Sequence, residues 1–236
     1  MMLHYLKKFS NWLLPRTCVF CKNLSYRHQD LCQPCLQDLP ILPQGCVRCA
    51  NILSTPQKNL TCGQCLKKSP PFDCSHVLFA YRAPIPKLIL NLKFHHTLIH
   101  AKLLGELFAE KIQSDWYRDK PLPTTIIPMP LHAKRLTERG FNQAVEIARP
   151  ISKILGLPLL IHDFQRKKPT LAQATLPALK RQQNLRNAFL IKRNLEQQHV
   201  AVIDDVITTG STIYEFCRAL KKQGAGRIDV WCCARP

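Results

Sequence analysis

One stretch of this chain, residues 199–223, most restricts the fold that the rest can adopt. It contains an unbroken apolar run, 200–203, of the kind found in strands buried on both faces of a parallel sheet. Two adjacent carboxylates, Asp204 and Asp205, follow the run, and a loop of small hydroxyl-bearing residues, 208–212, comes next. The remainder has apolar residues at helical spacing. A strand, a loop and a helix in this order predict an open α/β sheet whose ligand lies at the carboxyl ends of its strands.

The loop after the acidic pair has the composition of a phosphate site. Its backbone N–H groups and hydroxyls can donate to phosphate oxygens, and the helix that follows adds a favourable dipole at its N-terminus. Gly210 allows the backbone to close on a ligand. The carboxylates of Asp204 and Asp205 suit hydrogen bonds from sugar hydroxyls, or Mg²⁺. The stretch therefore predicts a site for a phosphorylated ligand.

The rest of the carboxyl-terminal region alternates between predicted strands and helices, which indicates a parallel sheet with helices on both faces. Residues 131–143 are expected to form a basic loop at the end of a strand. The predicted strands are 76–82, 124–127, 159–161, 189–191 and 228–233, and the predicted helices are 85–94, 98–112 and 142–155.

The charge balance favours polyanionic partners. The chain has 34 Lys and Arg against 15 Asp and Glu, a net charge of +19. Such an excess suits nucleic acid or phosphorylated ligands, with a solvated basic surface as the plain alternative. Two segments, 131–143 and 163–193, hold many of the bases, and the second is a candidate lid or nucleic-acid groove. The candidates for phosphate or DNA contact are Lys134, Arg135, Arg139, Arg166, Lys167, Lys168, Arg181 and Arg186.

Eight of the twelve cysteines form four Cys-x2-Cys pairs within residues 17–70. Each pair can present two thiolates, and two pairs complete a tetrahedral Zn²⁺ site. Sequential pairing is the simplest arrangement, and a cross-braced pairing of first with third is the alternative. An all-thiolate site leaves no open position, so we expect one or two structural Zn²⁺ ions. The predicted ligands are Cys18, Cys21, Cys32, Cys35, Cys46, Cys49, Cys62 and Cys65.

The amino-terminal residues 1–16 read as a short amphipathic helix. No run of about 18 apolar residues is present, so no membrane-spanning helix is expected. The start also lacks a signal-peptide pattern, which predicts a cytoplasmic protein, with contact at the inner face of the membrane as the alternative role of this helix. The predicted domains are the helix 1–16, a double zinc ribbon 17–70 and an α/β domain 71–236.

Two resemblances sharpen these expectations. Residues 202–212, Val-Ile-Asp-Asp-Val-Ile-Thr-Thr-Gly-Ser-Thr, match without departure the phosphoribosyl pyrophosphate (PRPP) motif of type I phosphoribosyltransferases. Residues 128–131, 139–143 and 181–189, with Gln173, are similar to the ComF (ComFC-like) family of competence proteins. The order of a cysteine-rich ribbon followed by a phosphoribosyltransferase domain is similar too, so the resemblance covers nearly the whole chain.

The first resemblance implies a type I phosphoribosyltransferase fold and a PRPP site that works with Mg²⁺. Asp204 and Asp205 would contact the ribose hydroxyls and be the catalytic pair. The pyrophosphate loop would be 129–135, with Lys134, Arg135 or Arg139 neutralising the leaving group. The PRPP-binding residues implied are Asp204, Asp205, Val206, Ile207, Thr208, Thr209, Gly210, Ser211 and Thr212.

The second resemblance implies a role in natural transformation, with single-stranded DNA and other DNA-uptake proteins as partners. One alternative is a metabolic phosphoribosyltransferase with an unidentified small-molecule acceptor. Another is a nucleic-acid or partner-binding module that has lost turnover. The motif implies PRPP binding and leaves open whether the site turns over.

Overall fold

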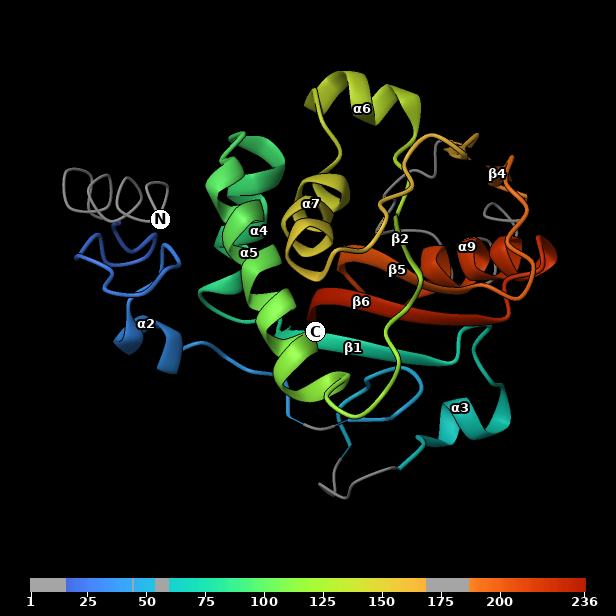
Figure 1. The fold of residues 1–236 in the computed structure, drawn as a ribbon, viewed down its shortest axis with the longest axis horizontal. Coiled ribbons are helices and arrows are strands. Elements are labelled where there is room, and N and C mark those ends of the chain that lie inside the picture. Colours follow the sequence, from blue (N-terminus) through green and yellow to red (C-terminus); the bar gives the residue numbers. More distant parts are fainter. Residues whose placement is uncertain (1–15, 44, 54–59, 169–186) are drawn as a thin grey trace, which may run out of the picture.

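The computed structural model describes residues 16–43, 45–53, 60–168 and 187–236. At its centre is a four-stranded, wholly parallel sheet in the order β1-β6-β5-β2 (Figure 1). The two central strands are buried along almost their whole length, as the unbroken apolar runs predict. The bounds are β1 (Cys74–Ala80), β6 (Arg227–Arg235), β5 (His199–Val206) and β2 (Thr125–Pro128).

Helices cover both faces of the sheet, which confirms the predicted α/β architecture. The connection from β1 to β2 crosses the sheet in one direction, and the connection from β5 to β6 returns in the other. Because such crossovers are right-handed, opposite directions place their helices on opposite faces. The first face carries α4 (Ile85–Phe94), α5 (Leu98–Lys111) and α7 (Gln143–Leu155), and the second carries α9 (Ser211–Lys222).

Two local predictions were wrong. The expected loop 131–143 contains a helix, α6 (Ala133–Arg139), which begins at His132, whose Nδ1 accepts from the backbone N–H of Lys134, and ends at a left-handed glycine. A π-helix, η1 (Ile112–Trp116), follows α5 directly. The predicted strand 159–161 is reduced to a single bridge between Leu159 and Ile126. A short antiparallel pair, β3 (Phe164–Arg166) and β4 (Phe189–Ile191), packs over α9.

The cysteine pairs assemble in sequential order, which settles the choice between sequential and cross-braced pairing. Within each tetrad the four Sγ atoms lie within 4.8 Å of one another, and no disulfide joins them. At the second site, the backbone N–H of Cys62 donates to Cys46 Sγ at 3.2 Å. The donor set and spacing fit structural Zn²⁺. The tetrads are Cys18, Cys21, Cys32 and Cys35, and Cys46, Cys49, Cys62 and Cys65.

The two ribbons are anchored differently. The first joins the main hydrophobic core through Cys18, Leu31 and Leu39, and its Asp30 forms an ion pair with Lys102 of α5 at 2.7 Å. The second has a separate small core made of its own four cysteines. It reaches the rest of the domain through Ala50, which belongs to the main core, and through polar contacts such as the Arg235 Nη1 to Cys49 carbonyl hydrogen bond of 2.9 Å. The second ribbon therefore depends on its metal for most of its cohesion.

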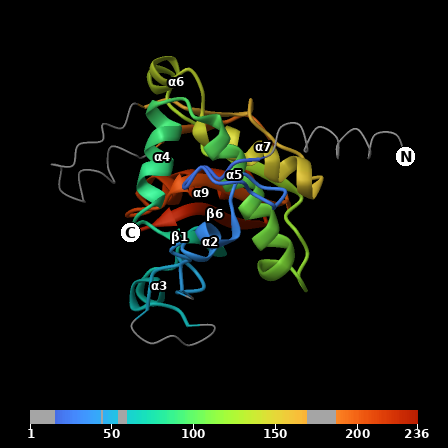
Figure 2. The same ribbon diagram turned by 90° about the vertical axis from the view of Figure 1, so that its left-hand side faces the viewer.

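Figures 1 and 2 show α3 (Gly63–Lys67), in the second ribbon, at the opposite end of the molecule from α6. The second ribbon thus lies away from α6. Among the described residues, no helix has both the length and the apolar character needed to cross a membrane. The predicted helix 1–16 lies almost wholly outside the described residues, and the domain boundaries at residues 16 and 70 remain predictions.

Metal analysis should find two Zn²⁺ ions per chain, because each tetrad supplies a complete ligand set. Cys18→Ser and Cys46→Ser should each lower the content to one, measured by mass spectrometry of the native protein. Cys217→Ala, which alters a buried cysteine outside both tetrads, is the matched control and should keep two. Full zinc content in either serine variant would contradict the assignment.

Candidate functional site

The predicted phosphate loop lies at the carboxyl end of β5 and leads directly into α9. Gly210 has a φ of +74°, and a Cβ at that position would meet the Tyr214 ring at 2.9 Å, so the turn requires glycine. Thr208 and Thr209 are exposed, and the Thr209 and Ser211 hydroxyls lie 3.0 Å apart. No side chain caps the start of α9, and its first turn contains no acid. Its N-terminal N–H groups therefore suit an anionic ligand.

Asp205, the second carboxylate of the pair, is held by two side chains from the α4 and α7 side of the sheet. Its side chain is 5% exposed and forms an ion pair with Lys93, which is 23% exposed. The Gln143 amide donates to the other carboxylate oxygen at 3.1 Å. One oxygen of this nearly buried carboxylate thus accepts a hydrogen bond and the other faces the Lys93 ammonium group, which offsets much of the cost of removing the charge from water.

Gln143 also connects Asp205 to Arg139. The Arg139 guanidinium donates to the Gln143 carbonyl oxygen and lies 5.7 Å from the centre of the Phe94 ring. Burial lowers the pKa of Arg139, and the Asp205 charge opposes that shift. The predicted basic residue Arg139 is therefore linked to the acidic pair through one amide, which fixes its position at the edge of the site.

Asp204 has the opposite electrostatic environment. The backbone N–H of Asp205 donates to its carboxylate at 2.9 Å. Desolvation raises the pKa of Asp204 well above the ordinary range, and the neighbouring Asp205 charge adds to the shift. A carboxylate that is costly to ionise without a ligand is a usual feature of a functional site.

Two further predicted bases come close to the acidic pair. Arg166 of β3 forms a parallel backbone β-bridge with His132 at the start of α6. Burial lowers the pKa of Arg166, and the Asp204 charge opposes that shift. Its guanidinium lies 5.8 Å from the centre of the Phe189 ring. Arg135 contributes to lowering the pKa of both Arg139 and Arg166, so the three guanidinium groups share one region. Clustered cations of this kind suit a pyrophosphate.

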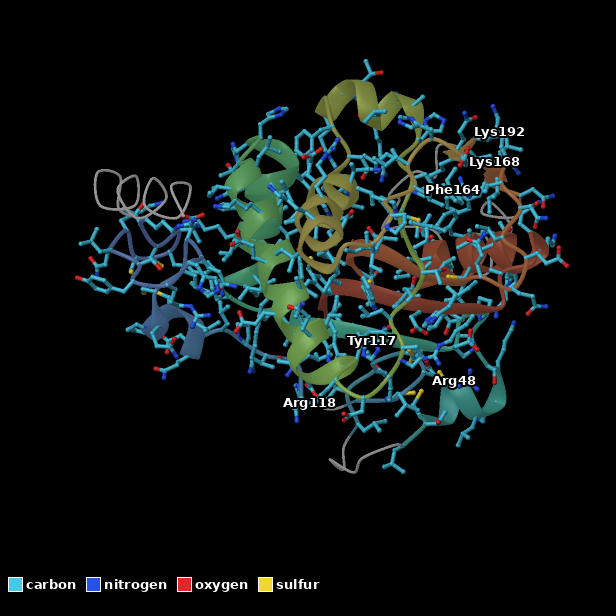
Figure 3. All side chains as sticks on the ribbon, in the orientation of Figure 1. Arg48, Tyr117, Arg118, Phe164, Lys168 and Lys192 are labelled. Atoms are coloured by element: carbon cyan, nitrogen blue, oxygen red, sulfur yellow. The ribbon has the colours of Figure 1, made fainter. Side chains whose placement is uncertain are left out.

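The other predicted bases are less closely grouped. Lys134 is exposed on α6, and Lys167 and Lys168 are exposed after β3. Figure 3 places Lys168 on the side of the molecule that carries β4. Arg181 and Arg186 lie outside the described residues. The structure thus gathers the arginines near the acidic pair and leaves these lysines at the surface around it.

Sequence reasoning missed Lys93 and Gln143 as site residues. Lys93 lies on α4, 111 positions before the acidic pair begins, and nothing in its local sequence distinguishes it from other helix-surface lysines. Gln143 belongs to the segment that resembles the ComF family, and that resemblance was the available signal. Its role in bridging Arg139 and Asp205 follows only from the fold.

Lys93→Gln should destabilise the protein by about 3 kcal/mol, because it leaves the buried Asp205 carboxylate without its cationic partner. Denaturant unfolding at neutral pH measures the change. Lys87→Gln alters an exposed lysine on the same helix and should stay within about 0.5 kcal/mol of the parent protein. Equal changes in unfolding free energy for both variants would show that the Lys93–Asp205 ion pair does not contribute to stability.

Asp204→Asn should stabilise the fold at neutral pH. An acid whose pKa is raised on folding destabilises the native state once it ionises. That cost is absent below the ordinary pKa of an aspartate and grows as pH rises toward the raised value. The stability difference between variant and parent should therefore be small near pH 4 and increase toward pH 7, measured by thermal unfolding at each pH. A variant less stable than the parent at pH 7 would contradict this account.

Comparison with known proteins accounts for this arrangement. The double zinc ribbon domain family matches residues 9–66, and the phosphoribosyl transferase domain family matches residues 142–235. A solved purine phosphoribosyltransferase from Pyrococcus horikoshii aligns over 57% of this chain and 73% of its own, at 23% identity and a TM-score of 0.35.

Longer matches come from curated proteins. Competence protein F of Haemophilus influenzae is 34% identical over 223 residues, which cover 92% of this chain and 96% of that protein. DNA utilization protein YhgH of Escherichia coli K12 is 32% identical over 224 residues, 94% of this chain and 98% of that one. Competence protein ComFC of Bacillus subtilis is 32% identical over 111 residues, 46% of this chain and 42% of that one. Because the matches to competence protein F and to YhgH span nearly the full length of both chains, this chain belongs to the ComF family, which joins a double zinc ribbon to a phosphoribosyltransferase domain.

Proposed function

We propose that this protein is a ComF-like competence protein that binds PRPP and handles single-stranded DNA in the cytoplasm during natural transformation. The observation that carries the proposal is the relationship over nearly the full length to a protein named competence protein F. Relatives named DNA utilization proteins support a DNA-linked role in the same way. A metabolic phosphoribosyltransferase with a small-molecule acceptor has no comparable support among the full-length relatives reported above.

The PRPP part of the proposal rests on the residues at the carboxyl end of β5. The loop and the uncapped start of α9 would hold the 5′-phosphate. Asp204 and Asp205 would accept hydrogen bonds from the ribose hydroxyls, and Arg135, Arg139 and Arg166 would contact the pyrophosphate. Lys93 and Gln143 keep the Asp205 carboxylate oriented for this contact.

Magnesium fits the donors available at this edge. Asp204 is partly buried at the end of β5 and offers a hard carboxylate oxygen beside the phosphate loop, the ligand type that Mg²⁺ takes together with substrate phosphates. When bound, Mg²⁺ would supply positive charge at the pyrophosphate. If the site turns over, the two carboxylates would stabilise positive charge that develops on the ribose ring.

The DNA part of the proposal rests on charge. The net charge of +19 and the exposed Lys134, Lys167 and Lys168 around the site suit a nucleic-acid backbone, since clustered cations gain from counterion release. PRPP and single-stranded DNA would then meet neighbouring parts of one basic surface. This places any chemistry at the ribose close to the strand.

The double variant Asp204→Asn with Asp205→Asn tests the proposal as a whole. PRPP binding with Mg²⁺, followed by calorimetry, should fall at least about 100-fold, because two charged acceptors are lost. Single-strand binding should persist, because the basic residues remain. Asp119→Asn, an exposed acid far along the chain from the site, is the matched control and should bind PRPP normally.

The same variants should be introduced into a naturally transformable host that depends on this gene product. Loss of transformation with the double variant and normal transformation with Asp119→Asn would support a role for PRPP binding in DNA handling. Normal transformation by a folded double variant would overturn that role. Normal transformation after deletion of the whole protein would overturn the competence function itself.

A further inference from the structure

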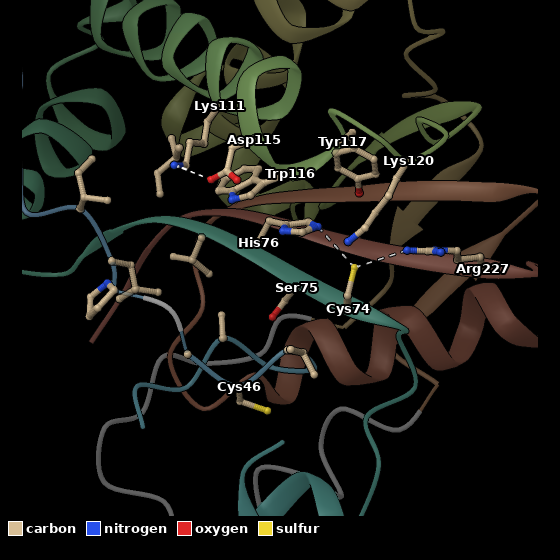
Figure 4. Close-up of a pocket in the computed structure, with 18 residues that line it drawn as sticks. Cys46, Cys74, Ser75, His76, Lys111, Asp115, Trp116, Tyr117, Lys120 and Arg227 are labelled. Carbon is tan, nitrogen blue, oxygen red and sulfur yellow. Dashed lines mark hydrogen bonds and ion pairs between the residues drawn. The ribbon is translucent and has the colours of Figure 1, made fainter. Parts of the chain in front are cut away.

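A pocket of about 500 Å³ lies between the second ribbon and β1 (Figure 4). It is lined by Cys46 and Val47 of the ribbon, by the first residues of β1, and by the segment around Trp116. Since β1 and β5 are parallel strands of one sheet, the start of β1 lies at the amino end of the sheet, whereas the acidic pair lies at the carboxyl end. The pocket is therefore distinct from the proposed PRPP site. Its volume is that of a small-molecule site.

One wall of the pocket is aromatic. The His76 and Trp116 rings stack with centroids 4.8 Å apart and an angle of 21° between their planes. Burial lowers the pKa of His76 to about 4, so the imidazole is neutral at neutral pH and acts as a flat, uncharged ring. The two rings cover each other's facing sides, so a planar group in the pocket can rest only against the edges or the remaining side of the pair.

A buried hydroxyl in the pocket has no partner. Ser75 is 7% exposed, and its Oγ makes no hydrogen bond to any part of the chain that the structure describes. In Figure 4 its side chain projects from the opposite side of β1 to Cys74 and His76, towards Cys46 of the ribbon. An unsatisfied buried hydroxyl is costly unless a ligand or water bonds to it. Ser75 thus marks a polar contact that the protein itself leaves unfilled.

The cations of the pocket differ in availability. Lys111 is paired with Asp115 at 2.7 Å, and Arg227 is paired with the buried Asp229 at 3.0 Å. Lys120, in contrast, enters no ion pair within the described ranges, and its ammonium group lies beside Cys74 in Figure 4. One lysine is therefore free to neutralise an anionic group near the aromatic wall.

We propose that this pocket binds one nucleotide unit across the edge of β1. The base lies against the His76 and Trp116 rings, Lys120 meets the phosphate, and Ser75 bonds a polar group of the base or sugar. Aromatic rings, an available cation and an unfilled donor around the edge strand together match this ligand class better than a purely apolar ligand, which would leave Ser75 and Lys120 unused. The unit is either a free mononucleotide or one residue of a single strand.

The test uses the full-length zinc-loaded protein with PRPP and Mg²⁺ in excess, so that the phosphate loop of the other site is occupied. Thymidine monophosphate and a thymidine hexanucleotide are titrated separately by calorimetry. Ser75→Ala should weaken binding about fivefold through one lost hydrogen bond, and should leave the fold intact because that hydroxyl has no protein partner. Lys120→Gln should weaken binding by a similar factor.

Arg118→Gln is the matched control, because it removes one positive charge from the same connection and Arg118 does not line the pocket. It should bind both probes as the parent does. Weaker binding of thymidine monophosphate in the two pocket variants would identify a mononucleotide site, and the same loss seen only with the hexanucleotide would identify a strand site. Absence of binding, equal losses with Arg118→Gln, or a loss only with Asp204→Asn and Asp205→Asn would overturn the proposal.

Discussion

Two adjacent carboxylates at the end of a buried strand are the constraint on which the functional half of this structure depends. Because side chains alternate along a strand, Asp204 and Asp205 cannot share one set of partners. Asp205 receives Lys93 and Gln143, drawn from two helices on one face of the sheet. Asp204 receives one backbone N–H, and its pKa is raised by burial. The arrangement therefore stabilises one carboxylate fully and leaves the other dependent on a ligand.

The zinc ribbons and the sheet are stabilised in different ways. The sheet has a continuous core that extends into the first ribbon through residues such as Leu31. The second ribbon has little apolar material beyond its four thiolates, so its coordinate bonds must replace a core. Its contact with the rest of the domain combines Ala50, which packs in the main core, with hydrogen bonds from Arg48 and to Cys49 from Arg235. The pocket lies between this metal-held module and the edge strand β1.

The sequence predicted those parts of the molecule that are governed by local pattern. The β5 strand, the glycine turn at Gly210 and the four Cys-x2-Cys pairs follow from residue type and spacing, whereas the choice between sequential and cross-braced pairing came from the structure. Long-range partners could not be predicted, because Lys93 meets Asp205 only after α4 has packed across the sheet. Helix α6 was missed because its seven residues have no buried face, so they lack the apolar periodicity on which such predictions rest.

The unequal carboxylates also bear on how ligand and fold are coupled. A group with a raised pKa is stabilised in its ionised form when positive charge or hydrogen-bond donors arrive, so a ligand that brings them relieves a cost that the empty site carries. In the proposed complex, PRPP with Mg²⁺ would supply both at Asp204, whereas Asp205 already has Lys93 and would gain little. Binding energy is then concentrated on the one carboxylate that the protein leaves under-compensated. The two carboxylates thus differ in role: Asp205 connects α4 and α7 to the sheet, and Asp204 remains available for contact with the proposed ligand.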